Sequence, residues 1–340
     1  MRAFVQYILC VVILIGATYA FVPWFYGVNY PKPPGPAFDP SIRTIFQQGI
    51  DKSKPQIVLI GDSLASVNID PVILSNNLGK SVYDVSLPGS ASTLWYLITK
   101  NNIATAKYKP EYLIVLFRDT MLTTPDYRVQ GSYFQQIDEF ANSNDKLLIQ
   151  LAFVNKMNWL DKLADQYIPP YGSRLKFRAT MDGQLRGLGP RLLLSCDNNC
   201  VDDSLSTVFR SDNFLSKVMG DAINSADKYL YTDQNLDFSH QIGQSFLPEI
   251  VRLCKENNIQ LILIRSKTLA FTPQSPAPAG LAGYITQLAS YAKQNNVIYL
   301  DYSNDQRITP DFYFDPVHFN DAVREKFTGF LSESLAPFMH

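Results

Sequence analysis

The stretch Gln-Ile-Val-Leu-Ile-Gly-Asp-Ser-Leu, at residues 56–64, decides the fold of this chain. Its first five residues form a short, mostly apolar run that ends at a glycine, a pattern typical of a strand buried on both faces. Further strands are predicted at Ser81–Leu87, Tyr112–Phe117, Gln260–Ile264 and Val297–Asp301. Helical patterns are found at Pro71–Leu78, Ser92–Ala106, Phe246–Asn257, Gly280–Gln294 and Ala322–Leu335. This alternation predicts an α/β fold with a flavodoxin-like, doubly wound sheet of about five parallel strands.

One long stretch interrupts the alternation. Between Asp119 and His240 the sequence has helical patches, aromatic residues and polar loops, but no clear strand–helix repeat. An ordinary connection is far shorter. We therefore expect an insertion after the third strand, at about residues 120–240, within a body that spans residues 51–340. We expect it to lie over the active face, as a lid or as a platform for a substrate or a partner.

The bulk composition limits the function classes. The chain has 340 residues, of which 46% are hydrophobic, so a sizeable core can form. Its 30 Lys and Arg residues stand against 31 Asp and Glu residues, which leaves no basic excess for a nucleic-acid partner. We find no His and Asp cluster with metal-ligand spacing. No metal or other cofactor is therefore expected, and a metal-dependent phosphate-ester hydrolase is disfavoured.

The N-terminal segment 1–27 is predicted to be a membrane anchor. Ala3 to Tyr26 form a nearly unbroken apolar run without a charged side chain, long enough to cross about 30 Å of hydrocarbon as a helix. Arg2 precedes the run, which favours a cytoplasmic N-terminus and an exported body. A cleaved signal peptide, with Thr18-Tyr19-Ala20 as processing site, is one alternative. A buried core helix is another.

Residues 28–50 are predicted to be a proline-rich linker. Five prolines fall between Tyr30 and Pro40. Such a segment is typical of a stiff, extended spacer, which here would hold the body off the membrane.

Two cysteines lie close together in the motif Cys-Asp-Asn-Asn-Cys, at Cys196 and Cys200. A small disulfide loop would suit an exported body. Two unpaired thiols or a metal site are the alternatives, although zinc usually needs four ligands and no histidine lies near.

The strongest local signal for chemistry is Gly61-Asp62-Ser63-Leu64, directly after the first predicted strand. Ligands in this architecture bind at the carboxyl ends of the strands. A serine at that edge lies near a helix start, whose backbone N–H groups can stabilise an oxyanion. The alternative is an ordinary strand-to-helix turn in which Ser63 only caps the helix.

A second motif, Asp315-Pro316-Val317-His318, lies just before the last predicted helix. A nucleophilic serine needs a base to take its proton, and the base needs an acid to fix its tautomer. Asp315 and His318, three residues apart on one short loop, can supply both. The other histidines are the terminal His340 and His240, for which we expect a solvated or core position. We therefore predict Ser63 as nucleophile, His318 as base and Asp315 as acid.

Together these features resemble the SGNH/GDSL hydrolase family, from about Gln56 to the end apart from the insertion. In that family an opening Gly-Asp-Ser motif carries the nucleophile, and a closing Asp-x-x-His supplies the acid and the base. A glycine after strand two donates an N–H group to the oxyanion, and Gly89 in Ser86-Leu87-Pro88-Gly89 fits that position. The resemblance implies the SGNH hydrolase fold and an acyl-serine intermediate.

The third block departs from the family pattern. The family usually has Gly-x-Asn-Asp after strand three, where the Asn completes the oxyanion hole, whereas this chain has Phe117-Arg118-Asp119-Thr120. Arg118 could donate to the oxyanion in place of the Asn. It could instead bind an anionic substrate group or pair with Asp119. The missing Asn also leaves altered or lost activity open.

A membrane-anchored SGNH domain with such a third block resembles the exported partners of membrane-bound O-acyltransferases. These partners help place acetyl or other acyl groups on cell-surface polysaccharides. The resemblance implies an O-acyltransferase or O-acetyl esterase in the bacterial inner membrane, with its catalytic domain on the exported side. Its partners would be an acyl donor, a glycan and a polytopic membrane acyltransferase. The alternative is a catalytically degenerate SGNH-fold binding or assembly partner of that acyltransferase.

Overall fold

The computed structural model describes residues 2–38, 41–181, 184, 228–269, 271 and 276–339. The chain divides into two compact units. The first comprises residues 1–42 and 129–197, and the second comprises residues 43–128 and 198–340. The second unit holds the sheet and all the predicted catalytic residues. Cys196 and Cys200 lie outside the described residues.

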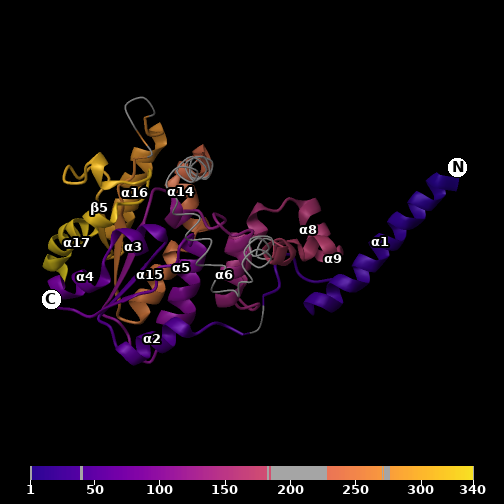
Figure 1. Cartoon of the computed structure of the whole chain (residues 1–340), viewed down its shortest axis with the longest axis horizontal. Helices are drawn as coiled ribbons and strands as arrows, with labels where there is room; N and C mark the ends of the chain where they lie inside the picture. Colours follow the sequence, from indigo (N-terminus) through magenta and orange to yellow (C-terminus); the bar gives the residue numbers. More distant parts are fainter. Residues whose placement is uncertain are drawn as a thin grey trace. The chain divides into compact units, whose positions relative to one another are not determined.

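Five parallel strands form one sheet in the order β2-β1-β3-β4-β5 (Figure 1). Their bounds are β1 Ile57–Gly61, β2 Val82–Asp84, β3 Tyr112–Phe117, β4 Gln260–Arg265 and β5 Ile298–Asp301. Strands β1 and β3 are buried along their whole length, as their solid apolar runs predict. The predicted fold class, a flavodoxin-like α/β sheet of five parallel strands preceded by an apolar helix, is confirmed.

The described helices divide between the two units. Those of the first unit are α1 Arg2–Tyr26, α6 Ser132–Phe140, α7 Lys146–Ala152, α8 Trp159–Tyr167 and α9 Pro169–Gly172. Those of the second unit are α2 Ile45–Ser53, α3 Ser63–Asn68, α4 Pro71–Leu78, α5 Ser92–Ile98, α13 Asp233–Leu236, α14 Phe238–Gln241, α15 Leu247–Glu256, α16 Ala279–Gln294 and α17 Asp321–Leu335. The helix predicted at Ser92–Ala106 changes partway, because Thr99–Ile103 follow α5 as a π-helical turn.

Helices cover both faces of the sheet. On one face α3, α4 and α17 share an apolar core with alternate strand residues such as Leu59, Ile114 and Ile262. On the other face α5 and α15 pack together, and α15 contacts β4 (Figure 1). Because both faces are covered, small molecules and reacting groups can approach the strands only at their ends, and the carboxyl ends are where the predicted motifs lie.

The first unit begins with helix α1. Residues Phe4–Tyr26 of this helix are long and apolar enough to cross a membrane, judged by length and composition. The proline-rich residues that follow α1 pack against residues of the insertion. Lys32 is buried, and its Nζ atom donates a hydrogen bond to Asp165 on α8 at 2.6 Å. Phe38 packs against Phe134 and Phe153, with ring centroids 5.9 and 6.0 Å apart.

Candidate active site

The first element of the site is the junction between β1 and α3. Gly61 must be a glycine there, because a Cβ atom would lie 2.6 Å from the Ala65 Cβ and 3.0 Å from the Leu116 carbonyl oxygen. Asp62 caps α3, and its side chain accepts a hydrogen bond from the Leu64 N–H group at 2.9 Å. Ser63 is the first helical residue. The cap therefore fixes Ser63 at the carboxyl edge of the sheet.

The second element is the loop before α17. An antiparallel bridge joins Tyr313 to Phe319, so the residues between them form a closed loop. The Phe314 N–H group donates to the His318 carbonyl oxygen at 3.1 Å, and the Leu269 N–H group after β4 donates to the Pro316 carbonyl oxygen at 2.8 Å. These backbone bonds give the loop one conformation. Its two functional side chains are thereby held in place.

The structure brings Ser63, Asp315 and His318 together as one hydrogen-bonded chain. The His318 Nε2 atom lies 2.8 Å from the Ser63 Oγ atom, and the His318 Nδ1 atom lies 2.7 Å from the Asp315 Oδ2 atom. With Nδ1–H donating to the carboxylate, Nε2 is left as the acceptor for the serine hydroxyl. This tautomer is the one in which an imidazole can take a proton from serine.

The surroundings of Asp315 keep it ionised. Burial by itself raises the pKa of the Asp315 carboxyl, but the hydrogen bond from His318 and the charge of that ring lower it. Two backbone N–H groups, from Val317 and His318, add to the lowering by donating to Oδ1 at 2.8 and 2.7 Å. The net pKa of Asp315 lies below its ordinary value of 3.8. The acid is therefore a carboxylate at neutral pH.

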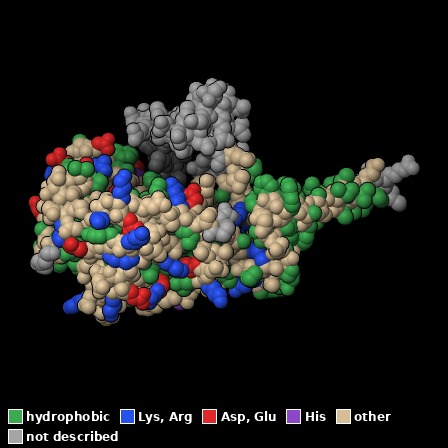
Figure 2. Space-filling view, turned by 90° about the horizontal axis from the view of Figure 1, so that it is seen from below, with side chains coloured by type: hydrophobic (Ala, Val, Ile, Leu, Met, Phe, Trp, Pro, Cys, Tyr) green, Lys and Arg blue, Asp and Glu red, His purple; other side chains and the backbone are tan. Residues whose placement is uncertain are grey.

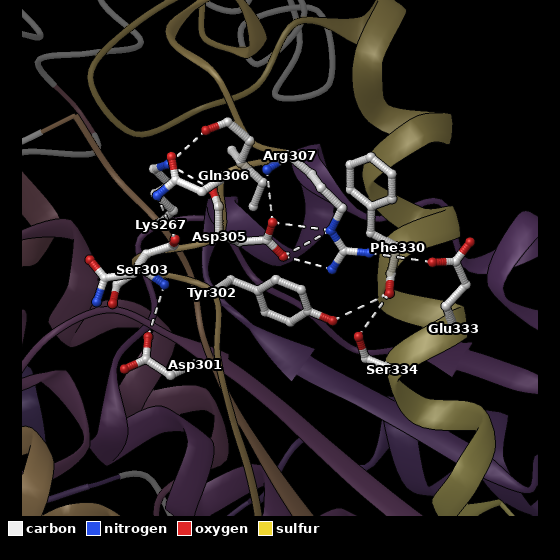
Figure 3. Close-up of polar contacts among 12 residues, drawn as sticks. Lys267, Asp301, Tyr302, Ser303, Asp305, Gln306, Arg307, Phe330, Glu333 and Ser334 are labelled. Atoms are coloured by element: carbon white, nitrogen blue, oxygen red, sulfur yellow. Dashed lines mark hydrogen bonds and ion pairs between the residues drawn. The ribbon is translucent and has the colours of Figure 1, made fainter.

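The chain between β5 and this loop is tied to α17 (Figure 3). The Tyr302 hydroxyl donates to the Phe330 carbonyl oxygen at 3.4 Å. The Arg307 guanidinium pairs with Asp305 at 2.6 Å and with Glu333 on α17 at 3.3 Å. These contacts fix the path along which the chain leads into the loop of Asp315 and His318.

Gly89, the predicted oxyanion glycine, lies in a turn after β2 that is bound to Gly61. The carbonyl oxygen of Gly61 accepts from the Leu87 N–H group at 3.0 Å and from the Ser90 hydroxyl at 2.8 Å. Gly89 has a φ of 78°, a conformation that glycine adopts at little cost. The turn that holds Gly89 is thus bound to Gly61, which precedes Ser63 by two residues. The oxyanion role of Gly89 remains a prediction.

Arg118 lies directly after β3 and is buried. Its Nη2 atom donates to the Tyr127 hydroxyl at 3.4 Å. The neighbouring Asp119 pairs with Arg265, at 3.0 Å. A second arginine, Arg128, lies 3.3 Å from the Asp62 carboxylate. Sequence reasoning missed Arg128, because nothing in the sequence links it to the Gly-Asp-Ser motif. A role for Arg118 in oxyanion binding remains a prediction.

A second Asp-x-x-His pair shows that spacing alone does not define such a site. Asp237 and His240 are also three residues apart. Asp237 caps the short helix α14, and its side chain accepts a hydrogen bond from the His240 N–H group at 3.1 Å. The His318 pair differs in lying on a loop whose closure turns the ring toward Ser63.

Asn68 is a positioning residue that sequence reasoning missed. It ends α3, the helix that begins with Ser63, and it is fully buried. Its Oδ1 atom accepts a hydrogen bond from the Phe319 N–H group at 2.9 Å. The helix of the nucleophile thereby holds the loop of the base directly. No sequence signal marks Asn68, since its role depends on a partner 251 residues away.

Replacing Asn68 by alanine is expected to lower the free energy of unfolding by about 1–3 kcal/mol, because the buried Phe319 N–H group would lose its acceptor. Ester turnover should fall as well, since the base loop would lose its tie to α3. Chemical denaturation and turnover of a small soluble ester measure the two effects. Asn77→Ala on α4 is the matched control, because Asn77 is exposed and its amide donates to the Ser332 hydroxyl at 3.2 Å, away from the loop of the base. Equal effects of the two substitutions would contradict the positioning role.

Comparison with known proteins gives distant likenesses only. No family model and no curated protein matches the sequence. The chain is similar to a GDSL-like lipase from Bacteroides thetaiotaomicron, with 11% identity, a TM-score of 0.35, and coverage of 83% of this chain and 90% of that chain. It is also similar to a variant of an acetyl-xylooligosaccharide esterase from Geobacillus, with 9% identity, a TM-score of 0.39, and coverage of 84% and 94%. Likenesses this distant assign no activity, so the chemistry rests on the geometry of the site.

Proposed function

We propose that this protein is a serine-dependent acyl-ester enzyme of the SGNH/GDSL kind. The observation that carries the proposal is the hydrogen-bonded chain from Ser63 through His318 to Asp315, with distances of 2.8 and 2.7 Å. A serine hydroxyl is a weak nucleophile unless a base takes its proton, and the base works best when an acid holds it. The Asp315 side chain is only 6% exposed, so water hardly competes for its bond to His318.

The proposed reaction has two halves. In the first, the Ser63 Oγ atom attacks the acyl carbonyl carbon while His318 takes the hydroxyl proton. The tetrahedral intermediate collapses when His318 gives that proton to the departing alcohol, which leaves an acyl-Ser63 ester. In the second half, water or a sugar hydroxyl gives its proton to His318 and attacks the ester carbonyl carbon. The bond between that carbon and the Ser63 Oγ atom then breaks as His318 returns the proton to Ser63, which releases the acid or the new ester and restores the starting state. Hydrolysis and transfer thus use the same residues and differ only in the acceptor.

The backbone N–H groups of Ser63 and Gly89 are the donors we propose for the oxyanion. Such donors act where charge develops, and one donor typically contributes 10²–10³-fold in kcat, or about 3–4 kcal/mol. Arg118 is the candidate for the third donor, in the place of the asparagine that the family usually has. The arginine at the position of that asparagine also favours the second candidate function, a catalytically degenerate binding or assembly partner.

We propose a cell-surface polysaccharide as the substrate or acceptor. Phe314 supports this proposal, because its ring stacks on the His318 ring, with centroids 5.7 Å apart, and its residue is 58% exposed. An exposed aromatic ring beside a reactive group offers a flat apolar surface on which a ligand can stack. The flat face of a sugar ring, which presents C–H groups, fits such a surface and would place its hydroxyls near His318.

We propose that α1 anchors the protein in the bacterial inner membrane, with the catalytic unit exported. The support is the length and apolar composition of this helix and the Arg2 residue before it. An exported enzyme has no cytoplasmic acyl donor at hand. A polytopic membrane O-acyltransferase that passes the acyl group across the membrane is therefore the partner we propose.

Acetyl release from a model ester, measured with and without an oligosaccharide acceptor, separates transfer from hydrolysis. We expect the acceptor to capture part of the acetyl groups as an O-acetyl oligosaccharide, which mass spectrometry detects. If every acetyl group appears as free acetate at saturating acceptor, the transferase proposal fails while the esterase proposal stands.

Replacing Phe314 by alanine is expected to raise the KM for the oligosaccharide about 3- to 10-fold, which corresponds to the loss of one aromatic contact. Turnover of a small ester without acceptor should stay nearly unchanged, because the ring does not take part in proton transfer. Phe338→Ala is the matched control, since Phe338 is also exposed but lies after α17 at the end of the chain. An unchanged KM in Phe314→Ala would count against the sugar surface.

A further inference from the structure

Helix α8 in the first unit is amphipathic, and its apolar face is exposed. Its large apolar side chains are 47–68% exposed: Trp159, Leu160, Leu163 and Tyr167. At 3.6 residues per turn they fall within about 100° around the helix axis, so they form one continuous stripe. We call these four residues the α8 stripe. A surface helix of a globular protein normally turns such a stripe toward the core.

The opposite side of α8 explains why the helix cannot turn over. Asp165 lies on that side and is buried. Its carboxylate pairs with Lys32 at 2.6 Å and with Arg174 at 2.5 Å, and it accepts the Gly35 N–H group at 2.8 Å. Turning the α8 stripe inward would strip a buried carboxylate of its partners, which is strongly unfavourable. The ion pairs of Asp165 therefore hold α8 in the orientation that exposes the α8 stripe.

The α8 stripe belongs to the part of the unit where α1 ends. Helix α1 contacts α9, which follows α8 directly (Figure 1). The helical residues 174–181 come next, and there the Thr180 side chain lies near that of Tyr26, the last residue of α1. Phe177 and Met181 on this stretch are also exposed. Figure 2 shows hydrophobic side chains along α1.

Basic side chains accompany the apolar ones. Residues 156–178 contain five basic and two acidic side chains, a net charge of +3 by subtraction. The basic residues are Lys156, Lys162, Arg174, Lys176 and Arg178. Of these, Arg174 pairs with Asp165 and Lys176 pairs with Asp138. A tryptophan, tyrosine and leucine face combined with lysine and arginine is the composition of helices that lie in the headgroup region of anionic membranes.

We propose that α8 lies in the membrane interface, with the α8 stripe inserted among the lipid headgroups on the side where α1 leaves the bilayer. The inference rests on the membrane-anchor part of the proposed function and is independent of the ester chemistry. A span alone leaves the exported part free to tilt and rotate. A second contact with the lipid, rigidly joined to the first through α9 and the Asp165 ion pairs, fixes the orientation of the first unit on the membrane.

The three tryptophans of the chain allow a direct test. Trp24 lies in α1, Trp95 is fully buried in α5, and Trp159 begins α8. The full chain with Trp24→Phe is reconstituted in vesicles that contain phosphatidylglycerol and a phospholipid brominated near the headgroup. We expect the bromine to quench roughly half of the Trp159 emission, since interfacial side chains lie at headgroup depth. Adding Trp159→Phe should abolish the quenching, because only the buried Trp95 then emits.

A second variant tests the stripe itself. Leu160→Glu with Leu163→Glu, in the Trp24→Phe chain, should at least halve the quenching, because two carboxylates would have to enter the interface next to anionic lipid. Turnover of a soluble ester should not change, since both residues are exposed and lie in the first unit. That readout keeps a failure of the proposed chemistry distinct from a failure of this inference.

The opposite result is equally clear. If Trp24 is quenched in the Trp159→Phe chain while Trp159 is not quenched in the Trp24→Phe chain, α1 has inserted and α8 has stayed in water. The inference would then be overturned, and the α8 stripe would be a surface for a protein partner. If neither tryptophan is quenched, α1 is not a membrane span and the inference falls with it.

Discussion

Replacing Ser63 by alanine is expected to remove ester turnover almost completely, by a factor of about 10⁴–10⁶ in kcat. The reason is that the proposed reaction passes through a covalent bond to the Ser63 Oγ atom, for which alanine has no substitute. The chain should otherwise fold normally, because the Asp62 cap of α3 does not use the serine side chain. A fluorophosphonate probe, which phosphonylates activated serines, should label the wild-type chain and leave Ser63→Ala unlabelled.

Ser66→Ala is the matched control for this experiment. Ser66 lies on the same helix, and its hydroxyl donates to the Ser63 carbonyl oxygen at 3.3 Å. It should keep both labelling and turnover. Labelling that survives in Ser63→Ala would remove the nucleophile assignment. A wild-type chain that takes up no label would instead favour the catalytically degenerate binding partner, in which the three side chains are present without chemistry.

Replacing Asp315 by asparagine is expected to lower kcat by about 10³–10⁴-fold while leaving the loop folded. An asparagine oxygen can still accept the N–H groups of Val317 and His318, so the backbone of the loop keeps its bonds. Its amide, however, donates to the His318 Nδ1 atom. The ring proton is then held on Nε2, where it blocks the transfer from Ser63. The fall in kcat is therefore caused by the wrong tautomer of His318 and not by unfolding of the loop.

The same substitution gives a pH-dependent difference in stability. The pKa of Asp315 is lower in the folded chain than its ordinary value of 3.8, so the ionised carboxylate contributes stability above that value. The contribution is lost as the pH falls through the lowered pKa. We expect the free energy of unfolding of the wild type to exceed that of Asp315→Asn at pH 5–8 and to converge with it well below pH 4.

Two measurements check these expectations, namely kcat at neutral pH and denaturation at several pH values. Asp321→Asn, which removes an exposed carboxylate in the first turn of α17, serves as the control and should change neither by much. A difference in the free energy of unfolding between wild type and Asp315→Asn that stays constant down to pH 2 would contradict this expectation. It would mean that the ionised Asp315 carboxylate is not what stabilises the wild type. An unchanged kcat in Asp315→Asn would remove its role as the acid.

The sequence predicted the sheet because its central strands, β1, β3 and β4, are buried on both faces. Such strands appear as solid apolar runs, and Tyr112–Phe117 was delimited to the residue. Helix α2, by contrast, was not predicted. It is only nine residues long and buries only Ile50, so its apolar residues, Ile45, Phe46 and Ile50, form a stripe too short to indicate a helix. The π-helical turn after α5 also escaped prediction, because the residues Thr99–Ile103 continue a helical pattern while their hydrogen bonds change.

The candidate site divides in the same way. Ser63, Asp315 and His318 were found because each lies in a short motif whose chemistry is local to the chain. Asn68 and Phe314 were not found, because their importance lies in which distant group they face. Asn68 looks like any helical asparagine until the Phe319 N–H group is known to point at it. Arg118 was singled out as a departure from the family pattern, but the position of its guanidinium beside Tyr127 depends on packing that the sequence does not show.

The distance along the chain between Ser63 and its base has a consequence for timing. His318 follows Ser63 by 255 residues. A chain that emerges from the ribosome or from a membrane channel therefore presents the serine long before the histidine exists beside it, and the serine is inert during that interval. Loss of the chain after β5 would likewise remove Asp315 and His318, although all five strands of the sheet lie before that point. The proposed chemistry can therefore begin only when the fold is complete and the loop before α17 has reached Ser63.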